Sequence, residues 1–107
     1  MRSAGRASYS SRRELARMLK QPLPIINALG LHARAAARLV RLAAGFKCRI
    51  TLIREDTGLT ANAKSILSVL HLAASFGTGL SVIAEGEDES DAIAAIKALF
   101  ESGFGEL

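Results

Sequence analysis

The hydrophobic period of the chain changes at Gly45, and this change limits the fold more than any other feature of the sequence. Over residues 33–44, apolar side chains recur three and four positions apart, which predicts an amphipathic helix that ends at Gly45. Over residues 46–52, apolar and polar side chains alternate, which predicts a strand with one face in water. Together they indicate helices packed on one face of a sheet.

The same patterns continue on both sides of this pair. In chain order, the predicted elements are a strand at 23–28, a helix at 33–44, strands at 46–52 and 59–61, a helix at 62–72, a strand at 80–85 and a helix that ends at Gly103. Turn residues at 55–58 make the second and third strands a hairpin. Short connections then predict an α+β fold, β-α-β-β-α-β-α, with a four-stranded, mostly antiparallel sheet and three helices on one face.

The length and charge of the chain limit the classes of partner. With 107 residues, the chain is long enough for one compact domain. Six of its 14 basic side chains lie within residues 1–20, against the single acid Glu14, so this segment carries +5 of formal charge and the remaining 87 residues carry −1. This placement argues against nucleic-acid binding by the domain. We interpret residues 1–21 as a basic, flexible extension and residues 22–107 as the domain.

Two other interpretations of the extension stay open, namely an organellar transit peptide and a natural start at Met18. No run approaches the roughly 20 apolar residues that span a membrane, and the first 20 residues lack the apolar core of a secretory signal. The single Cys48 cannot form an internal disulfide, in agreement with a reducing compartment. We therefore expect a cytoplasmic protein without membrane insertion.

His32 stands at the predicted start of the first helix, directly after Gly30 and Leu31. Free backbone N–H groups and the positive end of the helix dipole favour an anion at such a position. Arg34, in the same turn, can add a charge-assisted hydrogen bond to phosphoryl oxygens. A neutral imidazole nitrogen there is suited to carry a phosphoryl group covalently. Spacing alone leaves open the simpler interpretation that His32 is a solvated polar residue.

Three separated motifs make the chain similar to a known family. Gly-Leu-His-Ala-Arg at 30–34, Ala-Lys-Ser-Ile at 63–66 and Ala-Glu-Gly-Glu-Asp at 84–88 resemble, in order and spacing, the HPr phosphocarriers of the bacterial phosphoenolpyruvate-dependent phosphotransferase system. The resemblance covers residues 22–107 and implies an open-faced β-sandwich. It also implies that His32 takes a phosphoryl group from Enzyme I on Nδ1 and passes it to an EIIA-type acceptor, with Arg34 steadying the phosphate.

Two details refine this resemblance. Ala35 stands where the family usually has proline, so we expect a slightly softer helix start and retained transfer. The C-terminal segment 98–104 is more similar to NPr, the nitrogen-related branch, than to the sugar-transport carrier. The sugar and nitrogen branches both stay open, and with them the identity of the EIIA-type acceptor.

The second predicted helix bears the remaining candidate sites. Ser65 matches the position that HPr kinase/phosphorylase phosphorylates in many HPr proteins, but a role as helix N-cap also explains it. A phosphate there would add negative charge beside the docking surface. Ile66, Leu67 and Leu70 match the apolar patch through which the family docks its partners, unless they are simply core.

The other classes of function have weaker support. The sequence has no nucleotide-binding loop and no set of nucleophile, base and acid, so we expect no autonomous enzyme. His71 is interpreted as a structural histidine, and two His and one Cys do not make a metal site, so no metal and no cofactor are expected. The leading prediction is a monomeric phosphoryl carrier. The alternatives are a regulatory docking module controlled at Ser65 and, third, nucleic-acid binding through residues 1–20.

Overall fold

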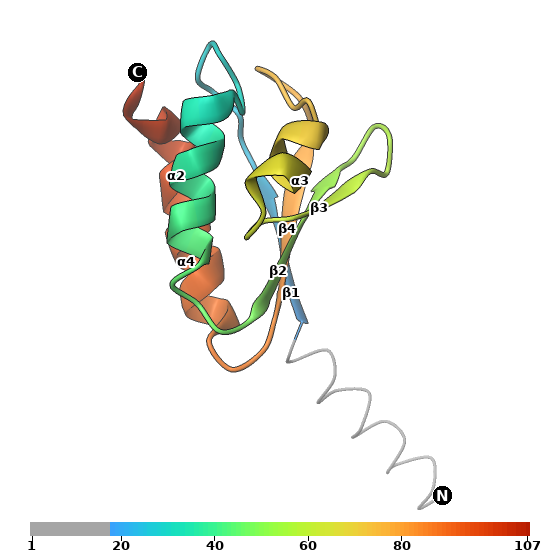
Figure 1. Cartoon of the computed structure of the whole chain (residues 1–107), viewed down its shortest axis with the longest axis vertical. Helices are drawn as coiled ribbons and strands as arrows, with labels where there is room; N and C mark the ends of the chain where they lie inside the picture. Colours follow the sequence, from blue (N-terminus) through green and yellow to red (C-terminus); the bar gives the residue numbers. More distant parts are fainter. Residues whose placement is uncertain (1–17) are drawn as a thin grey trace, which may run out of the picture.

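The computed structural model describes residues 18–107, and strands and helices account for most of them (Figure 1). In chain order these are β1 (Met18–Leu23), α2 (Ala33–Ala43), β2 (Arg49–Arg54), β3 (Thr60–Asn62), α3 (Ile66–His71), β4 (Leu80–Glu85), α4 (Glu89–Glu101) and the 3-10 helix η1 (Gly103–Gly105). The strands form one sheet in the order β1-β4-β2-β3, and all neighbours are antiparallel. The predicted α+β fold and its element order are confirmed. None of the helices in this part of the chain is long and apolar enough to cross a membrane.

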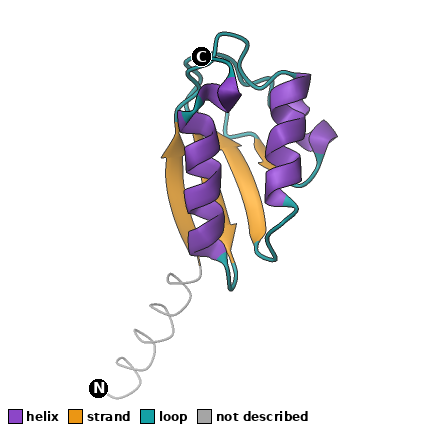
Figure 2. Cartoon of the chain, turned by 90° about the vertical axis from the view of Figure 1, so that its left-hand side faces the viewer, coloured by secondary structure: helices purple, strands orange, loops and turns teal. Residues whose placement is uncertain are grey.

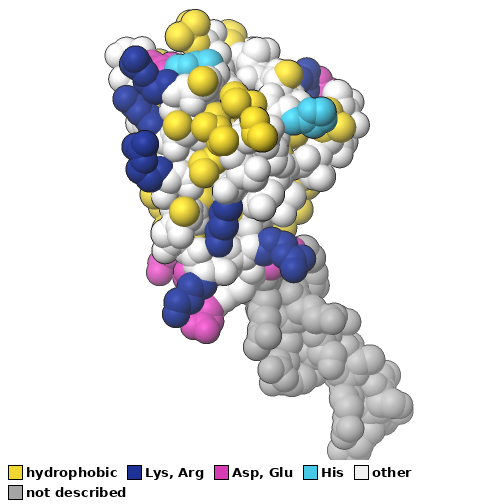
Figure 3. All heavy atoms as spheres, in the orientation of Figure 1, with side chains coloured by type: hydrophobic (Ala, Val, Ile, Leu, Met, Phe, Trp, Pro, Cys, Tyr) yellow, Lys and Arg dark blue, Asp and Glu magenta, His cyan; other side chains and the backbone are white. Residues whose placement is uncertain are grey.

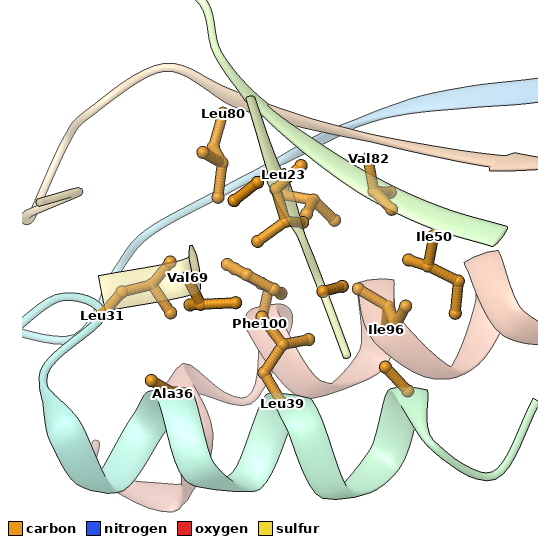
Figure 4. Close-up of a cluster of buried hydrophobic side chains, with 14 of the residues drawn as sticks. Leu23, Leu31, Ala36, Leu39, Ile50, Val69, Leu80, Val82, Ile96 and Phe100 are labelled. Atoms are coloured by element: carbon orange, nitrogen blue, oxygen red, sulfur yellow. The ribbon is translucent and has the colours of Figure 1, made fainter. Parts of the chain in front are cut away.

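The helices cover one face of the sheet, as the alternation in the strands requires (Figure 2). In β2, Ile50 and Leu52 are buried while Thr51 and Ile53 stay partly exposed, so one face of the strand needs cover. Figure 4 shows core side chains from both layers: Leu23, Ile50, Leu80 and Val82 from the strands, and Ala36, Leu39, Val69, Ile96 and Phe100 from the helices. Burial of these side chains supplies the main driving force for folding.

The first strand begins earlier than predicted, at Met18 instead of residue 23, and it ends at Leu23. It pairs with β4 over its whole length, with Pro22 opposite Ser81. Because β1 is an edge strand, a proline without an N–H group is tolerated in it. Residues 18–21, which the sequence analysis assigned to the extension, thus belong to β1, and the division into an extension and a domain stays a prediction. The prediction of a flexible extension now concerns residues 1–17, which lie outside the described residues.

The boundaries of β2, β3 and α3 also differ from the prediction. Strand β2 begins at Arg49, three residues later than predicted. The turn predicted at 55–58 does join β2 to β3 as a hairpin. Helix α3 begins at Ile66 instead of residue 62, because Asn62 still belongs to β3 and pairs with Thr51. The sheet thus takes Asn62, which helical periodicity assigned to α3, and residues 63 and 64 form the turn before the N-cap at Ser65.

Asp88 fixes the turn before α4 to the loop that leads into β2. Its carboxylate accepts hydrogen bonds from the backbone N–H groups of Lys47, at 2.7 Å, and Cys48, at 2.9 Å. Gly86, with φ of 144°, permits this close approach, since a Cβ atom there would lie 2.9 Å from the Cα atom of Cys48. The hydrogen bond from Lys47, followed by those from Cys48, holds the pKa of Asp88 below its usual range.

The contribution of Asp88 to the free energy of unfolding should therefore disappear in acid. Because the pKa of Asp88 is lower in the folded protein than in the unfolded chain, its carboxylate stabilises the fold above the unfolded value of about 3.9. This stabilisation is lost as the pH falls through the folded value. We expect Asp88→Asn to unfold at a lower temperature than the wild type at neutral pH, with the gap closing toward about pH 2.

Thermal unfolding followed by circular dichroism over this pH range measures the gap. Glu87→Gln is the matched control, because the exposed Glu87 carboxylate accepts no hydrogen bond from the residues that the structure describes. It should behave like the wild type throughout. A gap between Asp88→Asn and the wild type that stays constant with pH would contradict the prediction.

Candidate functional site

The segment before α2 presents His32 at the helix N-terminus. Gly30 adopts a left-handed conformation, with φ of 63°, and packs so closely on the loop after α3 that a Cβ atom would lie 2.6 Å from the Cα atom of Ser75. The N–H group of Leu31 donates to the carbonyl of Ala74 at 3.0 Å. His32 itself is extended, with φ of −72° and ψ of 178°, and is the N-cap of α2. These contacts fix the backbone from which the imidazole projects.

Both ring nitrogens of His32 have a partner. Nδ1 accepts a hydrogen bond from the backbone N–H group of Arg34 at 3.3 Å, as the side chain of an N-cap residue does. Nε2 lies 2.5 Å from Oε2 of Glu106, near the C-terminus of the chain. The side chain of His32 is 27% exposed, so the ring is accessible from solvent. Nδ1 therefore faces the helix N-terminus and Nε2 faces a carboxylate.

Glu106 brings the far end of the chain into the site. Its Oε1 atom accepts a hydrogen bond of 2.9 Å from Nδ2 of Asn27, which is almost fully buried. The hydrogen bond from Asn27, and then the contact with His32, holds the pKa of Glu106 below its usual range, so the carboxylate is ionised at neutral pH. Sequence reasoning missed both residues. Gly103 and Gly105 were the available signal, since they indicate a turn that folds the C-terminus back.

A shallow hollow of about 690 Å³ surrounds the accessible side of His32. It is lined by the loop before α2, the first turn of α2 and the C-terminal segment: Ala28, Leu29, His32, Ala33, Arg34 and Glu106. Arg34 is exposed, and its guanidinium group forms no ion pair with any residue between 18 and 107. The structure thus brings His32 and Arg34 together as predicted, in a hollow where N–H groups and a positive charge suit an anion.

The second helix carries the other predicted site residues. Ser65 is its N-cap and accepts a hydrogen bond from the N–H group of Ser68 at 3.4 Å, as predicted. Leu67 is 77% exposed and Ile66 is 39% exposed, whereas Leu70 is partly buried and packs against the core. We call Ile66 and Leu67 the α3 patch. Figure 3 shows hydrophobic side chains gathered on the face formed by α2 and α3.

His71 is not the structural histidine that the sequence predicted. It is the last residue of α3, and it is exposed. Val69 is the one residue of this short helix that is buried. The apolar neighbours in the sequence suggested a buried position, but they lie on the other sides of the helix. Within residues 18–107, no three His, Cys, Asp or Glu side chains gather as metal ligands would.

Comparison with known proteins adds to this geometry. The family model for the "PTS HPr component phosphorylation site" matches residues 19–102. The chain belongs to the HPr family. A phosphocarrier protein HPr of Xylella fastidiosa is 47% identical over 89 residues, which are 83% of this chain and 98% of the relative. A phosphocarrier protein NPr of Escherichia coli K12 is 43% identical over 88 residues, which are 82% of this chain and 97% of the relative.

Solved structures of the HPr family agree with this assignment. The crystal structure of HPr-C-His from Thermoanaerobacter tengcongensis matches with a TM-score of 0.75 at 38% identity, and the match covers 83% of this chain and 98% of that one. Proteins of the HPr family carry phosphoryl groups in the phosphotransferase system and are not enzymes in their own right. Because relatives named HPr and NPr match to a similar extent, the sugar and nitrogen branches are not resolved.

The start of α2 is regular even though the HPr family usually has a proline at the position of Ala35. The helix begins at Ala33, and the N–H group of Ala36 donates to the carbonyl of His32 at 2.8 Å, which closes the first turn. Ala35 is fully buried at the third helical position. The first turn of α2 is thus closed in this chain without the proline.

The N-cap of α3 yields a stability prediction. Ser65→Ala should lower the free energy of unfolding by about 1 kcal/mol, because the N–H group of Ser68 loses its acceptor. Ser65→Asp keeps a capping oxygen and should retain most of the stability. Urea unfolding measures both. Ser90→Ala, an exposed position in the first turn of α4, should change stability by less than about 0.5 kcal/mol. Equal losses for Ser65→Ala and Ser90→Ala would contradict the capping role.

Proposed function

We propose that this chain is a monomeric, cytoplasmic carrier whose His32 takes a phosphoryl group from Enzyme I on Nδ1 and passes it to an EIIA-type acceptor. One observation carries the proposal. Nδ1 lies at the N-terminus of α2, 3.3 Å from the N–H group of Arg34, while Nε2 is occupied by Glu106. Membership of the HPr family supports the reaction class, and the position of Nδ1 supports this choice of atom.

A phosphoryl group on Nδ1 would meet favourable electrostatics. The N–H groups of the first turn of α2 and the positive end of its dipole both stabilise an anion. Arg34 is exposed in the same hollow and adds charge-assisted hydrogen bonds to the phosphoryl oxygens. These groups stabilise the charge at the surface without enclosing it, so the next protein can reach the phosphorus. Such a site suits a carrier that must both accept and release its group.

The α3 patch supports docking of both partners. Large apolar side chains are unfavourable in water, and the 77% exposure of Leu67 leaves nearly the whole side chain available to a partner. The loop that follows α3 also holds Leu31 through the carbonyl of Ala74, which ties the patch to the segment that presents His32. This connection supports the proposal that a partner on this face also reaches the imidazole. A small interface of this kind dissociates readily, as alternating encounters with two partners require.

A second candidate function is regulation through phosphorylation of Ser65 by an HPr kinase/phosphorylase. The observation that favours it is the position of Ser65 directly before the α3 patch. A phosphate there would add between one and two negative charges, on the order of −1.5 to −2, beside the exposed Leu67. The charge would disfavour docking of an apolar partner surface without changing His32. The chain would then act as a regulated docking module as well as a carrier.

The carrier function predicts one labelled histidine. Incubation with Enzyme I and phosphoenolpyruvate should give an acid-labile, base-stable phosphohistidine on the wild type and none on His32→Ala. His71→Ala is the matched control, because His71 is the other exposed histidine and lies on α3, away from the helix N-terminus. It should be labelled like the wild type. Label that persists in His32→Ala, or its absence from the wild type, would overturn the proposal.

The docking surface predicts a loss of affinity that does not depend on the fold. Leu67→Glu should weaken binding of phosphorylated Enzyme I about tenfold or more, since burying a carboxylate against an apolar partner is costly. Leu59→Glu is the matched control, because Leu59 is 42% exposed on the hairpin between β2 and β3. Isothermal calorimetry should show near wild-type affinity for it. Equal affinities of the two variants would argue against docking through α3.

A further inference from the structure

The C-terminal turn adopts a backbone conformation that needs external support. Gly103, Phe104 and Gly105 follow α4 with φ values of 60°, 57° and 73°, so three successive residues are left-handed. Glycine accepts this region freely, but a phenylalanine does not. A non-glycine residue in this conformation persists where its surroundings hold it, and such residues cluster at functional sites.

Two contacts hold Phe104 in this conformation. Its ring is buried and meets the ring of Phe100 edge to face, with centroids 4.8 Å apart. Its carbonyl accepts a hydrogen bond from Nη1 of Arg38 on α2. The turn is thereby clamped to both long helices, and Figure 1 shows the C-terminus close to the N-terminal end of α2. The residue that the turn delivers to this end is Glu106.

The carboxylate of Glu106 is held by one donor on each oxygen. Nδ2 of the buried Asn27 donates to Oε1 at 2.9 Å and also to the carbonyl of Gly30 at 2.9 Å. Both partners of Nδ2 accept hydrogen bonds only, so the Asn27 amide has one orientation. Its second bond runs to the loop that presents His32. Oε2 of Glu106 is then left facing Nε2 of His32 at 2.5 Å.

We infer that Glu106 is a positioning residue that holds His32 as the Nε2–H tautomer and so keeps Nδ1 unprotonated, as an attack on phosphorus requires. A carboxylate has no hydrogen to donate, so the Nε2 atom facing it must carry one. Nδ1 then faces the N–H group of Arg34 with its lone pair, which agrees with the observed hydrogen bond. The inference rests on the proposed carrier function and adds a residue outside the three sequence motifs.

In this arrangement, phosphoryl transfer requires no proton movement at His32. The Nδ1 lone pair gives up the hydrogen bond from the N–H group of Arg34 and forms a bond to the phosphorus of an N-phosphorylated imidazole on the donor. The donor's P–N bond breaks, and its electron pair returns to the donor nitrogen. Nε2 keeps its hydrogen, so the ring of His32 gains positive charge, which the Glu106 carboxylate stabilises. Transfer to the acceptor reverses these steps.

Glu106→Gln tests the inference with little change of shape. Because Nδ2 of Asn27 is already oriented, the glutamine oxygen would face Asn27 and its NH2 group would face Nε2 of His32. A donor at that place disfavours the Nε2–H tautomer. Imidazole nitrogen chemical shifts of the full-length, isotope-labelled protein, at a pH where His32 is neutral, report the tautomer directly. We expect Nε2–H in the wild type and loss of this preference in Glu106→Gln.

The rate of phosphoryl transfer from phosphorylated Enzyme I provides the second readout. We expect Glu106→Gln and Glu106→Ala to slow it about 10- to 100-fold, as loss of a partner that orients a histidine does in metal sites. Glu101→Gln removes an exposed carboxylate from the end of α4 and should leave both the tautomer and the rate unchanged. Circular dichroism confirms that each variant is folded.

The outcomes separate this inference from the carrier function. An unchanged tautomer or an unchanged transfer rate in Glu106→Gln would overturn the role of Glu106 while the wild type still carries a phosphoryl group. The opposite result is also possible: the wild type shows the Nε2–H tautomer and Glu106→Gln does not, but the wild type takes no phosphoryl group. That result would overturn the carrier function and leave the positioning role standing.

Discussion

Short side chains between the helices and the sheet are the constraint on which the rest of the structure depends. Alanines without exposed surface line the inner faces of both layers: Ala35, Ala36, Ala43, Ala84 and Ala92. Alanine adds one carbon to the backbone, so α4 lies close to β1, β4 and α2, and a few large side chains such as Leu39 and Phe100 fill the remaining space. This close packing holds the N-terminal end of α2 and the C-terminal turn in one place.

The site is therefore a product of tertiary structure more than of the helix that bears the histidine. Its backbone is fixed from the loop after α3, through Gly30 and Leu31, and its ring is fixed from the last residues of the chain, through Glu106. Asn27 connects these two supports, because it donates to both. An imidazole on an isolated helix N-terminus would have the same dipole but a freely rotating ring. With these supports, the helix N-terminus does more than bind an anion, because the imidazole ring of His32 is also held in one orientation.

Local signals made much of this predictable, and non-local contacts account for what was missed. Three of the signals depend only on neighbours in the sequence: period-two alternation, the N-cap at Ser65 and the helix start at His32. The fold predicted from such signals is the observed one. The contact between His32 and Glu106 spans 74 residues, and no periodicity reports such a pairing. The start of β1 was missed because prolines reduce strand propensity, while pairing with β4 outweighs that effect at an edge.

The two edges of the sheet also bear on how copies of this chain meet one another. One edge is β1, which contains Pro22, and the other is β3, which has three residues. A proline lacks the hydrogen that a further strand would need, and a three-residue edge offers few backbone groups for pairing. Both edges are thus poor templates for sheet extension. When two copies of the chain collide, these edges therefore offer little backbone through which the two sheets could join.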